Sequence, residues 1–390
     1  MNIIEFLFWL SFVLLIYNYF LYPAFLFIHN KIFIKNNPLL VSDEFRPYVT
    51  FIISAYNEEE VIEEKIKNCF ELSYPENLLE IIVVSDASTD NTDKIVNESA
   101  SNDSRLRLLR QSERNGKSIG LNSAVKVAKG EFVIFSDANA MYEINAIQEL
   151  MKYFENPNVG YVVGKALYFD GKGNPATENE SLYWKYETFI KKLESDFHSV
   201  CVGDGAIYAI RRSLYDELKA DDIGDFANPL MIASKGYLGV FNQDAICYES
   251  AAGDYKKEFF RKRRIVNRSW RAFKRYIKLF NIKDHYKFLF ELFSHKILRW
   301  YNWLLLLLLF VTNLIIILIS PSIFFNVIFV LQMLALILAL FGKLAVRKGT
   351  ELPIYIYLPY YFYAVHFAAF LGILDDLRGV QWVTWEHVRQ

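Results

Sequence analysis

The amino-acid sequence predicts an α/β domain that is built on a mainly parallel sheet and flanked on both sides by transmembrane α-helices. Of its 390 residues, 53% are hydrophobic and 17% aromatic, which is too apolar for one ordinary soluble domain. The apolar residues saturate a segment near the N-terminus and a block after Arg299, while the middle alternates between strand-like and helix-like patterns. We therefore expect a membrane segment, a globular domain and a second membrane region, in that order.

The N-terminal apolar segment runs from Ile3 to Ile28 and contains one acidic residue, Glu5. It exceeds the roughly 20 residues needed to cross a bilayer core. Lys31 and Lys35 follow it and no small-residue cleavage site is evident, which favours a retained helix (1–30) over a cleaved secretory signal. By the positive-inside rule, the N-terminus lies outside and the bulk of the chain inside, beginning with a linker at 31–46.

The globular segment repeats a pattern of strand, polar loop and helix. One repeat begins at Tyr48, a second contains the apolar run Ile81 to Val84, and a further strand is expected over Glu131 to Ser136. Such alternation indicates a mainly parallel sheet, whose ligands bind outside the carboxyl ends of the strands. Asp86 and Asp137 both come at such ends.

Motifs in this segment resemble the family 2 glycosyltransferases, which have the Rossmann-like GT-A fold. The motifs SAYNEEE, SDASTDNT, NGKSIGLNSAV and FSDANA occur in the order and spacing of that family. The resemblance extends over essentially the whole chain and includes membrane-integrated synthases of cellulose, hyaluronan and poly-N-acetylglucosamine. It implies a GT-A domain at 47–255 and an inverting hexosyltransferase. Such an enzyme passes a sugar from a nucleotide diphosphate, by default UDP, to a saccharide acceptor in cell-surface or extracellular polysaccharide synthesis.

The same resemblance assigns donor-binding residues. Ala55, Tyr56 and Glu58 would line the base and ribose, and Asp86 would hold the edge of the base. Lys117 would lie near the diphosphate, with a solvated loop lysine as the alternative reading.

Asp137 and Asn139 occupy the positions of the family's DxD motif, which binds a divalent metal through the donor diphosphate. Hard oxygen ligands suit Mg²⁺ or Mn²⁺. In this chain an amide replaces the second carboxylate, so one negative charge is missing from the expected metal site.

Inverting transfer requires a general base opposite the leaving group. The family places this carboxylate just ahead of a helix that ends at a glycine followed by an aromatic residue. Asp225, with Gly236 and Tyr237 beyond it, matches that spacing and is the chosen base. Asp222 is the reserve candidate, and the alternative reading of Asp225 is a helix cap.

Acceptor-binding residues are expected on both sides of this base. The family places the acceptor near Asp204 and Gly205, for which a tight turn without a ligand is the alternative. The QxxRW motif of processive synthases is absent in standard form. RRIVNRSW lies at its distance and offers Arg264, Arg268 and Trp270, whereas the Arg-Trp pair in KILRW lies beside the membrane and suits an interface anchor.

A basic run follows the globular core and is opposed only by Glu258. Because it directly precedes apolar spans, we expect interfacial helices at 256–299 that meet anionic lipid headgroups, and no nucleic-acid binding. A C-terminal transmembrane region is expected at 300–375 and a tail at 376–390. The stretch from Pro353 to Leu374 is compatible with a full span, a re-entrant element or an interfacial helix.

Three cysteines, widely separated and odd in number, form no disulfide framework or zinc site. We expect an integral protein of a bacterial or archaeal plasma membrane, with a cytoplasmic catalytic domain. Two other functions stay open: transfer to a polyprenyl phosphate or another lipid-linked acceptor, and a non-catalytic membrane component that binds a nucleotide sugar. A transporter is disfavoured, because so few spans do not easily enclose a polar path.

Overall fold

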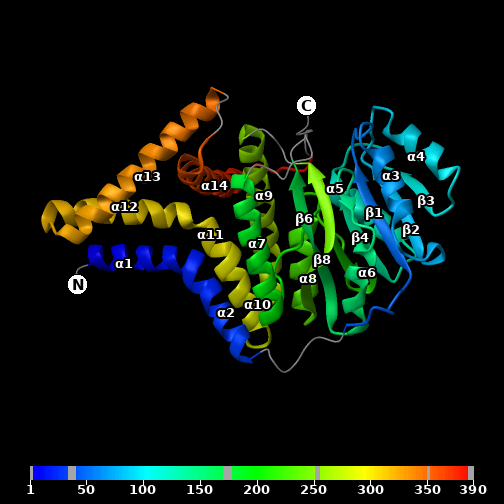
Figure 1. Cartoon of the computed structure of the whole chain (residues 1–390), viewed down its shortest axis with the longest axis horizontal. Coiled ribbons are helices and arrows are strands. Elements are labelled where there is room, and N and C mark those ends of the chain that lie inside the picture. Colours follow the sequence, from blue (N-terminus) through cyan, green and yellow to red (C-terminus); the bar gives the residue numbers. More distant parts are fainter. Residues whose placement is uncertain (1–2, 34–40, 170–177, 251–254, 349–351, 385–390) are drawn as a thin grey trace. The chain divides into compact units, whose positions relative to one another are not determined.

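The computed structural model describes residues 3–33, 41–169, 178–250, 255–348 and 352–384 (Figure 1). The chain divides into two compact units. The first, here called the helical unit, contains Met1–Ile28, Gly253–Asn267 and Leu292–Val380. The second, the sheet unit, contains His29–Ala252, Arg268–Glu291 and Gln381–Gln390.

The sheet unit contains one eight-stranded sheet of order β3-β2-β1-β4-β7-β6-β8-β5. Its parallel pairs are β1 with β2, β1 with β4, β2 with β3 and β6 with β8, and its antiparallel pairs are β4 with β7, β6 with β7 and β5 with β8. The strands are β1 (Val49–Ala55), β2 (Leu79–Ser85), β3 (Leu106–Arg110), β4 (Phe132–Asp137), β5 (Met141–Tyr142), β6 (Val159–Phe169), β7 (Tyr208–Arg211) and β8 (Leu238–Ser250). The expected mainly parallel α/β fold is confirmed.

Two strands differ from expectation. The strand expected over Glu131 to Ser136 is β4, which is shifted by one residue, and β3 precedes it in the chain. Strand β3 has the sequence LRLLR and lies at the edge of the sheet, and only its first residue is buried. It therefore lacks the continuous apolar run that marks a strand covered on both faces.

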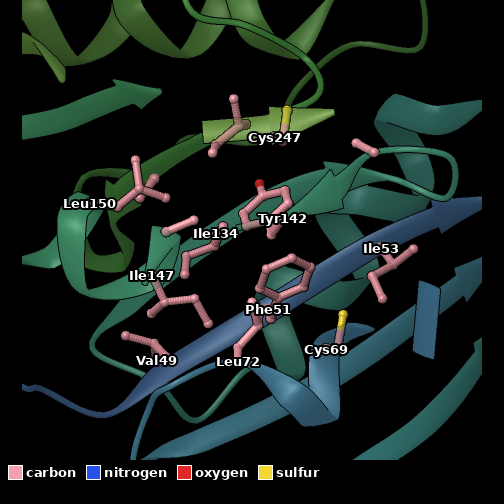
Figure 2. Close-up of a cluster of buried hydrophobic side chains, with 14 of the residues drawn as sticks. Val49, Phe51, Ile53, Cys69, Leu72, Ile134, Tyr142, Ile147, Leu150 and Cys247 are labelled. Carbon is pink, nitrogen blue, oxygen red and sulfur yellow. The ribbon is translucent and has the colours of Figure 1, made fainter. Parts of the chain in front are cut away.

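Helices pack against the sheet, and the buried core contains side chains of both. The helices of this unit are α3 (Ile62–Glu71), α4 (Thr92–Ala100), α5 (Lys117–Val127), α6 (Ala146–Met151), α7 (Glu178–Phe197), α8 (Gly224–Ser234) and α10 (Ile282–Leu292), with short 3-10 turns at Glu76–Leu78, Lys152–Glu155, Arg212–Leu214 and Ile277–Leu279. All residues of β1 and β2 are buried. Figure 2 shows part of this core, where the rings of Phe51 and Tyr142 meet edge to face at 4.9 Å. The three cysteines are buried and free.

The helical unit contains the apolar helices. They are α1 (Ile3–Ile16), the π-helical turn Tyr17–Leu21, α2 (Tyr22–Phe33), the π-helical turn Phe293–Ile297, α11 (Leu298–Trp300), α12 (Asn302–Ile319), α13 (Ile323–Arg347) and α14 (Ile354–Leu377). The end of α2, from His29 on, is assigned to the sheet unit. Within the part of the chain that the structure describes, four helices are long and apolar enough to cross a membrane: Ile3–Phe33, Asn302–Ile319, Ile323–Arg347 and Ile354–Leu377. The stretch from Pro353 to Leu374 therefore forms one continuous helix, α14, which begins after Pro353 and is long enough to span a membrane.

Aromatic and amide side chains join these helices. Phe8 of α1 meets Phe325 of α13 edge to face at 5.0 Å, and the Asn18 amide donates to Asn302 Oδ1 at 2.5 Å. Paired polar side chains of this kind hold apolar helices together where water is absent.

The long basic helix α9 (Tyr255–Tyr276) contributes to both units. In the helical unit, Arg263 forms a two-point ion pair with Asp375, with both N–O distances 2.6 Å. In the sheet unit, Arg271 and Arg275 bind Asp221. Several charges of the expected lipid-facing run are thus neutralised within the protein, by carboxylates too distant in sequence to be paired with them beforehand.

Candidate active site

The carboxyl ends of β1, β2 and β4 bring the predicted donor residues to one edge of the sheet. Ala55 pairs with Ser85, the residue before Asp86, and Ser54 pairs with Asp137. Because these three strands are parallel neighbours, the loops that follow them open at the same edge. The sequence placed Asp86 and Asp137 at neighbouring strand ends, and the structure agrees.

Asp86 is nearly inaccessible, at 2% exposure, and organises the loop before α5. Its Oδ1 accepts from Gln111 Nε2 at 2.7 Å and from the backbone amides of Asn115 and Gly116 at 2.9 and 3.0 Å. Its Oδ2 accepts from the Gly116 amide at 3.1 Å. A carboxylate oxygen has two acceptor positions, so Oδ2 retains capacity for a ligand donor. Gln111 was not singled out from the sequence.

Gly116 allows a close approach in this loop. Its φ of +87° lies in a region that favours glycine, and a Cβ there would lie 2.7 Å from the carbonyl oxygen of Val383. The C-terminal end of the described chain therefore lies against the loop that Asp86 organises. No motif in the sequence indicated this contact.

The loop after β1 is tied to the loop after β2. The backbone amide of Asn57, whose φ is +52°, donates to Ser88 Oγ at 3.1 Å, and that of Glu58 donates to Thr92 Oγ1 at 2.8 Å. The Arg114 guanidinium lies 3.9 Å from the centre of the Tyr56 ring, a cation–π distance. These contacts fix the positions of two predicted donor residues, Tyr56 and Glu58.

Lys117 is the first residue of α5, and its ammonium donates to Asp137 Oδ1. Its side chain is 25% exposed. The lysine is thus an ion-paired residue at the strand edge and not a solvated loop residue. An ammonium in this position carries the charge needed beside a diphosphate.

The Asp137 and Asp225 carboxylates face one point above Gly205. A Cβ on Gly205 would lie 3.4 Å from Asp225 Oδ2 and 3.8 Å from Asp137 Oδ2. The neighbouring Gly203 amide donates to the Asp225 carbonyl oxygen at 2.6 Å, and a Cβ there would lie 2.8 Å from that oxygen. The two glycines leave room for the carboxylates to approach a shared space.

Asp225 lies in the first turn of α8, where the N-cap residue is Ile223. The capping alternative is therefore not what the structure shows. Asp225 Oδ1 is buried and accepts no hydrogen bond from the described residues. Burial raises the pKa of Asp225 above its ordinary value, Lys117 opposes this rise, and the charges of Asp204 and Asp137 add to it. A carboxylate with a raised pKa and an unused acceptor oxygen is suited to take a proton.

Asp222, the reserve candidate, is fully buried, and both of its carboxylate oxygens accept hydrogen bonds. It accepts from the Lys219 amide at 2.8 Å, from the Tyr276 hydroxyl at 2.6 Å and from Arg275. These contacts attach the end of α9 to the loop before α8. The geometry favours Asp225 over Asp222 as the base.

The predicted acceptor residues Arg264, Arg268 and Trp270 all lie on α9. Arg268 is 6% exposed and donates to Ser118 Oγ at 3.2 Å and to the Asp222 carbonyl oxygen. Burial lowers the pKa of Arg268, although Asp225 and other carboxylates oppose this. Trp270 stacks on Phe273 at 5.4 Å, and Arg264 belongs to the helical unit. Arg268 therefore lies next to the start of α5.

Asp204 is held by a residue that sequence patterns missed. Lys191 of α7 donates to Asp204 Oδ2 at 3.1 Å, and the Ala206 amide donates to Oδ1 at 3.4 Å. The tight-turn interpretation of Asp204 is thus compatible with the structure, and the ion pair adds a charge partner to it. Lys191 lies on an ordinary amphipathic helix, so no local signal distinguishes it.

The proposed metal ligands offer a carboxylate oxygen from Asp137 and an amide oxygen from Asn139. Such hard oxygen donors fit Mg²⁺ or Mn²⁺. Asn139 Nδ2 donates to Glu249 Oε1 at 2.9 Å, which brings a second carboxylate to the motif beside that of Asp137. Glu249 lies on β8, far from the motif in sequence, and was not predicted.

Residues 50–219 match the family model described as glycosyl transferase family 2. Over 172 residues the chain is 32% identical to a beta-monoglucosyldiacylglycerol synthase of Nostoc sp., covering 44% of this chain and 37% of the relative. Over 180 residues it is 31% identical to a poly-beta-1,6-N-acetyl-D-glucosamine synthase of Staphylococcus epidermidis, covering 43% and 41%. A dolichyl-phosphate beta-glucosyltransferase of Trichomonas vaginalis is 31% identical over 163 residues, which are 39% of this chain and 47% of the relative. The chain spans less than half the length of each of these relatives.

Among solved structures, the chain is similar to the mannosyltransferase PcManGT from Pyrobaculum calidifontis, solved in complex with GDP-Man and Mn²⁺. The TM-score is 0.71 at 23% identity, covering 95% of this chain and 99% of that one. This likeness extends the fold comparison over nearly the whole chain. The family model confirms the resemblance over residues 50–219, and the likeness in structure confirms the expected fold.

Proposed function

We propose that this chain, which carries a glycosyl transferase family 2 domain over residues 50–219, is an inverting, membrane-integrated glycosyltransferase. It transfers a hexose from a nucleotide diphosphate donor, UDP-linked by default, to a saccharide acceptor. The proposal draws on one observation above all. The Asp225 carboxylate shares the space above Gly205 with Asp137, and its Oδ1 accepts no hydrogen bond within the described chain.

In the proposed reaction, Asp225 takes the proton of the acceptor hydroxyl as its oxygen attacks the anomeric carbon of the donor. The bond between that carbon and the β-phosphate oxygen breaks, and the nucleoside diphosphate leaves with its electron pair. Gly205 leaves room for the reacting groups between Asp225 and Asp137. Holding donor and acceptor in this geometry supplies much of the rate enhancement expected of such a site.

The donor side is proposed to use Asp86, Lys117 and Asp137. Asp86 Oδ2 accepts from the base or ribose, and the Lys117 ammonium pairs with the diphosphate. A divalent ion bound through Asp137 and Asn139 would neutralise the charge that develops on the departing diphosphate. Ala55, Tyr56 and Glu58 complete the proposed nucleotide pocket, and Asp204 with Arg268 the acceptor side.

A lipid-linked acceptor is the second candidate. Relatives with similar identity are named for a polymer product, for a glucosyldiacylglycerol and for dolichyl phosphate, so they divide between the two acceptor classes. The four apolar helices are compatible with membrane integration, which suits either acceptor. We propose that the sheet unit faces the cytoplasm, where nucleotide sugars are made.

The experiment is nucleotide release by the full chain purified in detergent, with Mn²⁺ or Mg²⁺, against a panel of UDP- and GDP-sugars. We expect release from one donor and its loss in chelator. Product analysis then separates the acceptors, since a water-soluble saccharide supports the first candidate and an organic-extractable, single-sugar lipid the second. Nucleotide release that is unaffected by chelator would contradict the proposed metal dependence. If no donor gives release even when membrane extract is added as a source of acceptor, the proposed glycosyltransferase activity would be contradicted.

A further inference from the structure

We infer that Glu249 is a positioning residue of the metal site, because it orients the Asn139 amide and supplies the negative charge that the motif lacks. This inference rests on the proposed function. Asn139 stands where the family motif has a second carboxylate, and Glu249 is the carboxylate that hydrogen bonds to it. None of the motifs that carry the family resemblance includes this position of β8.

The sheet topology explains how Glu249 reaches the motif. Directly after the motif, β5 pairs antiparallel with β8, with Met141 opposite Tyr248 and Tyr142 opposite Cys247. Continued by one residue, this register sets Glu249 beside the end of the motif. Figure 2 shows Cys247 on β8 close to Tyr142. Side chains alternate along a strand, so Glu249 lies on the same face of β8 as buried Cys247.

The hydrogen bond fixes which way the amide points. A carboxylate only accepts, so the atom of Asn139 that lies 2.9 Å from Glu249 Oε1 must be the nitrogen. The amide oxygen is then directed away from Glu249 and is available as a hard ligand. Without this partner, the amide could rotate and turn its two N–H donors toward a cation. Partners that orient a ligand in this way typically change metal affinity by about 10 to 100-fold.

The charge of Glu249 also matters at this site. Asp137 is the one carboxylate of the motif, and Lys117 already pairs with it. Lys65 lies fully buried on α3, and its ammonium donates to the Ala140 carbonyl oxygen just beyond the motif. The local cations thus oppose binding of another cation. Glu249 restores a negative charge beside the amide, as the second carboxylate of a DxD motif would do.

The test measures Mn²⁺ binding by electron paramagnetic resonance on the purified full chain, with UDP or GDP as the diphosphate. We expect Glu249→Gln to weaken Mn²⁺ binding at least tenfold, because the charge is lost and the glutamine amide can take either orientation. The double variant Asn139→Asp with Glu249→Gln should recover affinity to within about threefold of wild type. It rebuilds the carboxylate–amide pair with the two partners exchanged.

Glu143→Gln is the matched control. Its carboxylate comes directly after β5 and accepts from the Tyr248 hydroxyl, so the variant removes one charge from the same pair of strands. We expect wild-type Mn²⁺ affinity, with circular dichroism confirming the fold of each variant.

Three results would overturn the inference, and a fourth would contradict the proposed function. Unchanged affinity in Glu249→Gln would remove the residue from the metal site. An equal loss of Mn²⁺ affinity in Glu143→Gln, or no recovery of affinity in the double variant, would mean that Glu249 only stabilises the pairing of β5 with β8. Absence of Mn²⁺ binding by the wild type with either nucleotide would contradict the metal dependence of the proposed function itself.

Discussion

The Asp137 and Asp225 carboxylates converge on one position, because each places an oxygen within 4 Å of the point where a Cβ of residue 205 would lie. The Gly205→Ala variant adds a methyl group at that position. We expect its kcat/KM to fall about 100-fold, since misplacement of reacting groups by about 1 Å has costs of this order. The measurement is steady-state nucleotide release by the variant.

Gly236→Ala provides the control for this substitution. Gly236 has a φ of +86°, and beyond its own chain neighbours a Cβ there would meet open space, so alanine strains the backbone without filling the site. We expect a lower Tm and unchanged kcat/KM. Equal kcat/KM losses in both variants would indicate a general folding effect and would contradict the role of Gly205.

The pH dependence of transfer should follow Asp225. Burial raises the pKa of this carboxyl, and a base must be ionised, so kcat/KM falls as the pH drops below that raised pKa. The Asp204→Asn variant removes a charge that contributes to the rise, so the acidic limb should move to lower pH. Lys191→Met removes a charge that lowers the same pKa, so its limb should move to higher pH. If the acidic limb of the kcat/KM profile has the same position in the wild type and both variants at saturating metal, a group other than Asp225 controls that limb.

Asp225 and Asp222 should affect stability in opposite directions. A folded-state pKa above the unfolded value means that ionised Asp225 opposes folding at neutral pH, and this penalty disappears as the pH falls through the folded pKa. Asp225→Asn should therefore raise Tm at pH 7.5 and lose this advantage near pH 4. Asp222→Asn should lower Tm at pH 7.5, because it weakens the bonds to Arg275 and Tyr276. Thermal unfolding in detergent measures both, and equal shifts would contradict the distinction.

Asp86 should control nucleotide affinity. In Asp86→Asn, only one oxygen remains for the Gln111, Asn115 and Gly116 donors, so the loop before α5 loses its fixed position. We expect the Kd for the nucleoside diphosphate to rise by about 10 to 100-fold, in line with about 1–3 kcal/mol for unsatisfied buried donors. Asp103→Asn, which weakens an ion pair with Arg105 before β3, is the control and should bind nucleotide as the wild type does. Calorimetric titration that finds equal Kd values for both variants would remove Asp86 from the donor site.

The strand ends were predictable from sequence because buried parallel strands are continuous apolar runs followed by polar residues. Asp86 and Asp137 follow from such local patterns. Asp225 was instead chosen on the spacing that the family resemblance implies, and it lies in the first turn of α8. The choice between Asp225 and Asp222 depends on which carboxylate α9 contacts, and no local pattern encodes that contact. That helix follows the two aspartates in the chain and contacts Asp222 only in the folded protein.

Other site residues carry no local signal. Glu249 is 110 positions from Asn139, and it reaches the motif only because β5 and β8 pair. Lys191 and Gln111 belong to an ordinary helix and to a strand end, where basic and polar residues are common. The basic run of α9 predicted a lipid-facing surface, whereas Arg263, Arg271 and Arg275 find carboxylate partners through tertiary contacts. Long-range pairing of this kind is decided by topology and not by composition.

The assignment of Asp225 as the base is tested most directly by measuring the transfer rates of Asp225→Asn and Asp222→Asn together with their donor affinities. Both are measured with the donor that the wild type accepts. We predict that both variants bind donor as the wild type does, that transfer is abolished in Asp225→Asn, and that Asp222→Asn retains it at temperatures below its lowered Tm. Full transfer by Asp225→Asn, or equal loss in both folded variants, would contradict the assignment of Asp225 as the single base.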